Sequence, residues 1–83
     1  SRCEMQFNID FTNGDLQNQW NDAEVILSQK MDNQTVYDIM KYAKQKTEPK
    51  YNLEIKTWIS GGKTIRVGSP WGMRAVDVTI WSK

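Results

Sequence analysis

The sequence predicts a small α+β domain in which one helix packs on a β-sheet. Apolar and polar residues alternate near the start of the chain and again after Pro49, which is typical of strands, whereas the stretch before Pro49 has helical spacing. With 83 residues, the chain is expected to form one domain, residues 1–83, with a small core. No apolar run is long enough to span a membrane, so a soluble protein is expected.

The first strand is predicted where apolar residues alternate with polar ones. Its apolar positions are Met5, Phe7, Ile9 and Phe11. Residues 12–15 (Thr-Asn-Gly-Asp) follow as a turn signal that ends this strand.

The helix is predicted over about residues 34–46. Its apolar positions, at helical spacing, are Val36, Ile39, Met40 and Ala43. Thr35 is the candidate N-cap, with Asp38 three residues later. The helix must end before Pro49, which favours an extended conformation at Glu48.

Three strands are predicted after the helix, joined as an antiparallel meander. Residues 53–60 alternate in polarity, and Gly61-Gly62 is a two-residue hairpin signal leading into residues 63–67. Residues 69–72 (Ser-Pro-Trp-Gly) predict another turn before a last strand, in which Val76, Val78 and Ile80 face one way.

Residues 15–31 can be interpreted in two ways. Leu16, Trp20, Ala23, Leu27 and Met31 have helical spacing, but the segment from Glu24 to Ser28 also alternates. We favour a strand over about residues 23–29. The reason is that Asn18, Asn21 and Asp22 suit helix interiors poorly, whereas the β-branched pair Val25-Ile26 suits a sheet.

With that strand, the order β-β-α-β-β-β resembles the ubiquitin-like β-grasp fold, a mixed sheet around one helix. The segment Lys30–Val36 is similar to the passage from the second strand into the helix of those domains. Residues 35–43 followed by 51–55, Gly62–Gly68 and Asp77–Trp81 also resemble extracellular β-grasp domains related to the C-terminal domain of cobalamin carriers such as intrinsic factor. This resemblance spans about residues 23–81. It implies an open sheet face, favours an extracellular over a cytoplasmic location, and suggests glycan or corrinoid-like ligands.

If residues 15–31 are helical instead, the order becomes β-α-α-β-β-β. That order resembles, in outline, the small ribonuclease toxins of toxin–antitoxin pairs. The resemblance would give Tyr51, Lys63, Arg66 and Arg74 roles in cutting RNA, although the chain has no histidine and a net charge of only +1.

Motifs for other chemistry are weak. Cys3 is the only cysteine and histidine is absent, so an internal disulfide or a zinc cluster is not expected. Gly62-Lys63-Thr64 imitates the end of a phosphate-binding loop, but Thr57 stands where that motif needs a glycine. The carboxylates are scattered, and Asn33-Gln34-Thr35 is a glycosylation triplet that matters only after secretion. We expect no enzyme, no cofactor and no metal.

Aromatic and basic residues point to a binding surface instead. The chain has four tryptophans, and Trp58 and Trp81 alternate with the apolar positions that should pack under the helix. Residues 42–83 carry eight basic and three acidic side chains, whereas residues 1–41 carry three and seven. The face opposite the helix is expected to hold Lys56, Trp58, Thr64, Arg66, Asp77, Thr79 and Trp81. Trp20 and Trp71 are expected to anchor loops.

The sequence thus predicts a non-enzymatic interaction module. Its predicted binding residues are Lys56, Trp58, Arg66, Arg74 and Trp81. A protein partner is favoured because the near-neutral charge gives little phosphate-driven affinity. A single-stranded nucleic acid is the alternative ligand, and a homodimer through a sheet edge is also open.

Overall fold

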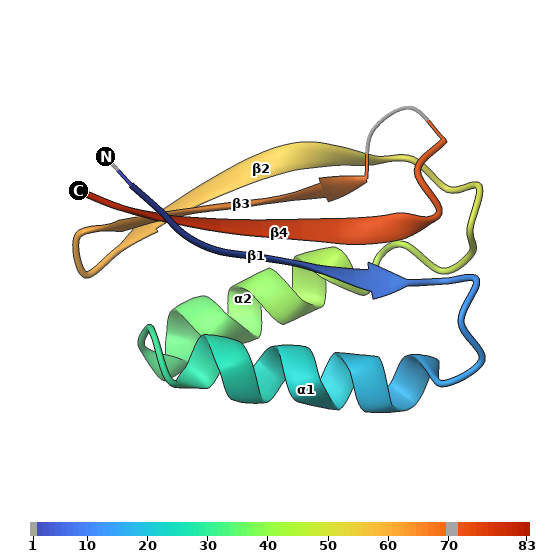
Figure 1. Ribbon diagram of the computed structural model, residues 1–83, viewed down its shortest axis with the longest axis horizontal. Helices are drawn as coiled ribbons and strands as arrows, with labels where there is room; N and C mark the ends of the chain where they lie inside the picture. The colour runs from blue at the N-terminus through green and yellow to red at the C-terminus, as the bar shows by residue number, and fades with distance from the viewer. Residues whose placement is uncertain (1, 70–71) are drawn as a thin grey trace.

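The computed structural model describes residues 2–69 and 72–83, which form one sheet and two helices. In chain order the elements are β1 (Arg2–Asp10), α1 (Leu16–Ser28), α2 (Asn33–Ala43), β2 (Leu53–Ser60), β3 (Lys63–Ser69) and β4 (Ala75–Ser82). Both helices lie on the same side of the sheet, and the other side is open (Figure 1). The α+β class is therefore confirmed.

The sheet is antiparallel throughout, with the strand order β1-β4-β3-β2. The predicted meander of the last three strands is confirmed, and β1 joins it on the far side of β4. The mixed sheet of a β-grasp domain is not found, because every strand pair is antiparallel. The element order is the alternative, β-α-α-β-β-β.

The strand predicted over residues 23–29 is wrong, since residues 23–28 belong to α1 and Gln29 is the C-cap of that helix. The apolar residues at helical spacing explain why this segment is a helix, because Trp20, Ala23 and Leu27 are all buried in the core. The residues that suit helices poorly lie on the solvent side, where Gln17 donates a hydrogen bond to Asn21 at 3.1 Å. Val25, which a strand would use, is 57% exposed. Packing of the apolar stripe outweighs local propensity here.

The helix predicted over about residues 34–46 is confirmed as α2, but its ends differ from the prediction. It spans Asn33–Ala43, and the N-cap is Asp32, not Thr35. The Asp32 carboxylate accepts hydrogen bonds from the backbone N–H and the hydroxyl of Thr35. It also accepts one from the hydroxyl of Ser60 at 2.9 Å, which fixes the start of α2 to the end of β2.

The Gly61-Gly62 hairpin is confirmed. Both glycines have positive φ angles, 57° and 77°, which only glycine adopts without strain, and the turn closes between Ser60 and Lys63. The predicted turn over residues 69–72 includes positions 70 and 71, which lie outside the described residues. The role predicted for Trp71 lies outside them too.

The core lies between the helices and the sheet. Leu27, Ile39, Ile65, Val76 and Ile80 are completely buried in it. Trp20 is part of this core at 7% exposure, and its ring packs edge-to-face on Phe11 with centroids 5.9 Å apart. The prediction that Trp20 anchors a loop is therefore wrong, because the residue lies inside a helix.

One lysine is buried as deeply as the core residues. Lys46 follows α2 and is 1% exposed. Its ammonium donates hydrogen bonds to the carbonyl oxygens of Pro49 (3.1 Å), Tyr51 (2.7 Å) and Met73 (3.0 Å). Burial lowers the pKa of Lys46 from its ordinary value, and Glu48 opposes this shift. The lysine joins the α2–β2 connection to the segment that precedes β4.

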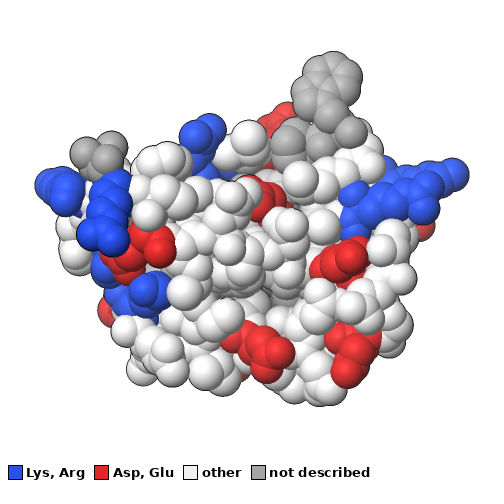
Figure 2. Space-filling view, in the orientation of Figure 1, with Lys and Arg blue, Asp and Glu red and all other residues white. Residues whose placement is uncertain are grey.

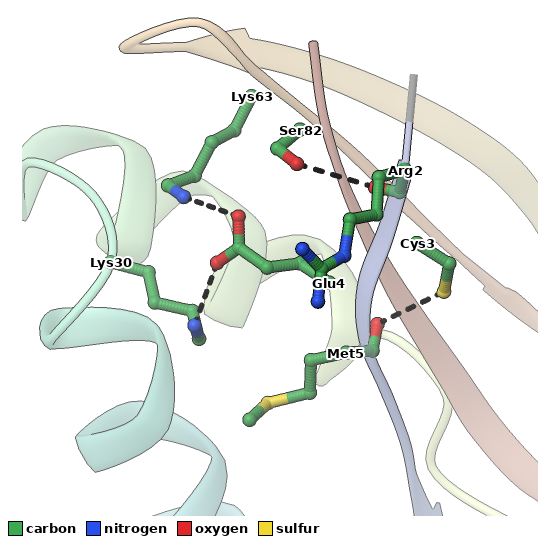
Figure 3. Close-up of polar contacts among 7 residues, drawn as sticks. All are labelled: Arg2, Cys3, Glu4, Met5, Lys30, Lys63 and Ser82. Carbon is green, nitrogen blue, oxygen red and sulfur yellow. Dashed lines mark hydrogen bonds and ion pairs between the residues drawn. The ribbon is translucent and has the colours of Figure 1, made fainter.

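A carboxylate near the chain start joins three parts of the fold. Glu4 accepts one hydrogen bond from Lys30, just after α1, and one from Lys63, at the start of β3 (Figure 3). The Lys30 contact measures 2.7 Å and the Lys63 contact 2.5 Å. These two contacts lower the pKa of Glu4 to about 2. Glu4 sits at a register shift of β1, between Cys3 and Met5.

We expect Glu4 to make stability depend on acid pH. Its pKa is lower in the folded state (about 2) than the ordinary value of 4.5, so its contribution is complete above about pH 4.5. The contribution is lost as pH falls from about 4.5 to about 2. Urea unfolding at several pH values should show this loss in the wild type and a shallower dependence in Glu4→Gln. Equal pH dependence in both proteins would show that Glu4 is not the source of the acid sensitivity. The control is Glu24→Gln, on the exposed side of α1, which should keep the pH dependence of the wild type.

Candidate functional site

The candidate site is the open face of the sheet, the side that the helices leave uncovered. We define it by the strand residues that point away from the helices: Cys3, Gln6, Asn8, Asp10, Ile55, Thr57, Ile59, Thr64, Arg66, Gly68, Asp77, Thr79 and Trp81. The register of the strand pairs determines which residues belong to this face, because residues paired across strands lie on the same face of a sheet. Arg66 pairs with Thr79 and Thr64 with Trp81, so β3 and β4 bring the guanidinium and the indole onto one surface. This placement of Arg66 and Trp81 agrees with the sequence prediction.

Lys56 and Trp58 do not lie on the open face, which corrects the sequence prediction. The pairing of β2 with β3 shifts between Leu53 and Lys56, as a β-bulge does. After the shift, Trp58 pairs with Ile65 and Lys56 with Val67, on the helix-covered side. Simple alternation from Leu53 could not show this, because one extra residue moves the rest of the strand to the other face.

Lys56 and Trp58 instead form a cluster with Tyr42 at the margin of α2 and β2. The Trp58 and Tyr42 rings meet edge-on with centroids 5.5 Å apart. The Lys56 ammonium lies 5.0 Å from the Trp58 centroid and 5.2 Å from that of Tyr42. Tyr42 is not among the residues predicted from the sequence. Its hydroxyl donates a hydrogen bond to the Glu54 carbonyl at 2.6 Å, and burial raises its pKa. Helical spacing after Ile39 was the only signal for it.

Arg74 is also separate from the open face. It precedes β4 and lines a shallow hollow with Glu48, Pro49 and Lys50, near the connection that Lys46 fixes. Its carbonyl accepts a hydrogen bond from the Phe11 N–H at 2.8 Å. The five predicted binding residues therefore lie in three places.

The open face has a hollow of ≈ 220 Å³ over β3 and its neighbours. Its lining residues are Ile55, Arg66, Val67, Gly68, Met73, Asp77, Thr79 and Trp81. Gly68 leaves room for the β2 backbone, because a Cβ built there would be 2.8 Å from the Ile55 Cα. Ile55 is 51% exposed, so an apolar side chain lies at the rim.

The two charged groups at this hollow differ in how they are held. Asp77 accepts hydrogen bonds from Gln6 (2.9 Å) and Thr79 (3.1 Å), and also from Asn8 (2.7 Å) when its amide nitrogen faces the carboxylate. The Arg66 side chain is exposed and has no ion pair or hydrogen bond with the residues in 2–69 and 72–83. The positive charge of Arg66 is thus available to a ligand, whereas the negative charge of Asp77 is already satisfied.

Charge is unevenly spread on the side of the molecule formed by β1 and α1. Figure 2 shows basic groups mainly at its two ends with acidic groups beside them, further acidic groups toward α1, and mostly uncharged surface in the middle. Neither helix of the described chain has the length and apolar character needed to cross a membrane. The described residues also contain no cluster of three or more Cys, Asp or Glu side chains suited to a metal ion.

No family model, curated protein or solved structure was found to match this chain.

Proposed function

We propose that this chain is a non-enzymatic binding module whose open face binds a protein partner. The observation that supports this most is the Arg66 guanidinium, which pairs with no residue of the described chain and lines a largely apolar hollow, with the half-buried Trp81 indole on the same surface. Arginine and tryptophan commonly contribute most to the affinity of protein interfaces. The partner segment that fits best presents an acidic side chain to Arg66 and an apolar side chain to the hollow at Gly68.

The charge of the open face supports a protein partner over a nucleic acid. Arg66 is the only basic side chain among the strand residues that define this face, whereas two of them, Asp10 and Asp77, are acidic. Affinity for a phosphate backbone grows with the number of phosphates neutralised, and one arginine neutralises few. The other basic residues of the predicted site lie elsewhere.

A ribonuclease is the second candidate, because the observed β-α-α-β-β-β order is the order on which that resemblance depends. The residues that it would use are spread over the molecule, however. Lys63 is paired with Glu4 on the helix-covered side, whereas Arg66 is on the open face. Tyr51 lies in a third place, the connection between α2 and β2, where its carbonyl accepts a hydrogen bond from Lys46 at 2.7 Å. We therefore favour the binding module.

Selection of peptides from a random displayed library against the protein tests the proposal. Enriched peptides should carry an acidic residue near a bulky apolar one. Arg66→Glu should weaken their binding by about 2 kcal/mol, roughly 30-fold in Kd, because the substitution removes the attraction and adds repulsion. Titration calorimetry would measure the change.

The matched control is Lys41→Glu, which makes the same charge reversal on the exposed side of α2. Equal losses in both variants would mean that only net charge matters, and the proposal would fail. It would also fail if a mixed-sequence single-stranded oligonucleotide bound through Trp81 with steep salt dependence, because that result favours a nucleic-acid site.

A further inference from the structure

The sheet has two edge strands, β1 and β2. The outer side of β2 is not paired with any strand in residues 2–69 and 72–83. Edge strands tend to pair with other chains unless charges, prolines or a covering segment prevent it. From Ile55 to Ser60, β2 has no proline, and Ile59 and Ile55 are 77% and 51% exposed. The one charged side chain of this stretch, Lys56, lies over the Trp58 and Tyr42 rings. This edge is therefore poorly protected.

The hairpin determines which backbone groups face outward. Ser60 and Lys63 flank a two-residue turn with positive φ at both glycines, and such flanking residues form a hydrogen-bonded pair. Hydrogen bonding alternates along an antiparallel strand, so Trp58 and Lys56 also bond to β3. The N–H and C=O groups of Thr57 and Ile59 then point to the free edge.

We propose that β2 of one chain pairs with β2 of a second copy in antiparallel orientation, with Thr57 on the two-fold axis. The two copies would form one eight-stranded sheet with both open faces on the same side. In this register Thr57 meets Thr57 of the other copy as a hydrogen-bonded pair, which the outward direction of its backbone groups permits. The pairing is isologous, so every contact occurs twice.

The side chains match in this register. Ile55 of one copy lies opposite Ile59 of the other, which joins the two exposed apolar side chains of the strand on the open face. Lys56 lies opposite Trp58 on the helix-covered face, where a cation and an indole attract each other. A register centred on Lys56 would place two lysines opposite each other, and one centred on Trp58 would place Ile55 opposite Gly61. With a net charge of +1, the two chains repel each other little.

A charge exchange at the two-fold axis tests the proposal. Thr57 is exposed, so Thr57→Lys and Thr57→Glu should both fold. Thr57→Lys places like charges directly opposite each other, beside Arg66 of its own chain, and should raise the dimer dissociation constant by roughly tenfold or more. Thr57→Glu should raise it less, because Arg66 pairs with position 57 across β2 and β3 and attracts the carboxylate. An equimolar mixture of the two places lysine opposite glutamate and should restore the dimer. Sedimentation equilibrium over a range of concentrations would measure each constant.

Val25→Lys, on the exposed side of α1, is the control and should dimerise like the wild type. The proposal is overturned if the wild type stays monomeric, if the single variants dimerise normally, or if the mixture does not recover. It is also overturned if Val25→Lys dissociates equally. Amide exchange of the wild type gives a check without substitution, because the N–H groups of Thr57 and Ile59 should become protected as concentration rises. The proposed contacts between the two copies do not include Arg66, and the peptide experiment does not use the edge of β2, so failure here and failure of the peptide experiment are distinguishable.

Discussion

Lys46→Met is expected to cause the largest loss of stability of any single substitution considered for this chain. Methionine keeps the apolar stem but leaves the carbonyls of Pro49, Tyr51 and Met73 without their shared donor. The Met73 carbonyl keeps its hydrogen bond from the Ser69 hydroxyl at 3.0 Å, so the carbonyls of Pro49 and Tyr51 are the ones left unsatisfied. Each buried unsatisfied polar group costs about 1–3 kcal/mol, so a loss of about 3 kcal/mol is expected. For a domain of this size, such a loss removes a large part of the total stability.

Urea unfolding followed by tryptophan fluorescence would measure the Lys46→Met effect. The matched control is Lys41→Met, which makes the same change five residues earlier at an exposed position. Surface changes of this kind are commonly within about 0.5 kcal/mol of neutral. A loss below about 1 kcal/mol in Lys46→Met would show that water replaces the ammonium at these carbonyls.

Gly68→Ala is expected to destabilise the sheet by about 1–3 kcal/mol, the usual cost of overpacking. The added Cβ would lie 2.8 Å from the Ile55 Cα and 2.9 Å from its Cγ1. Because the first of these atoms is backbone, rotation of a side chain cannot relieve the contact. The strand β2 must move away from β3 near its bulge, which also changes the shape of the hollow.

Gly14→Ala is the matched control, since nothing lies within 4 Å of the added Cβ and no positive φ is required there. It should be neutral or slightly stabilising, because alanine restricts the unfolded chain. Chemical denaturation of both variants separates the two effects. Equal stability in the two proteins would contradict a close approach at Gly68. Amide shifts of Ile55 would show whether β2 has moved.

The sequence predicted the elements whose pattern is local and regular. The hairpin at Gly61-Gly62 and the helix containing Val36 and Ile39 follow from turn chemistry and periodicity, and both are found. α1 was misassigned because its solvent face contains poor helix formers, and the burial of Leu27 outweighs them. Local propensity contains no information on which residues a neighbouring sheet will cover.

The candidate site was only partly predictable, for a different reason. Arg66 and Trp81 follow the alternation of β3 and β4 without interruption, so their placement could be deduced. Lys56 and Trp58 follow a bulge, and nothing in the polarity of residues 53–56 marks it. Asp77 received no specific role, because its donors Gln6 and Asn8 come from β1, at the other end of the chain.

The pairing of β1 with β4 affects how the domain can assemble. Arg2 pairs with Ser82, so the strand pair beside α1 joins the segments that are farthest apart in the sequence. Such a contact must close a loop of nearly the whole chain, and non-local contacts of this kind slow folding. During synthesis on a ribosome, β1 cannot pair until β4 has been made, whereas the β2–β3 hairpin can form earlier. The two ends also lie beside each other (Figure 1). The domain could therefore be inserted into a loop of another protein with both junctions at nearly the same point.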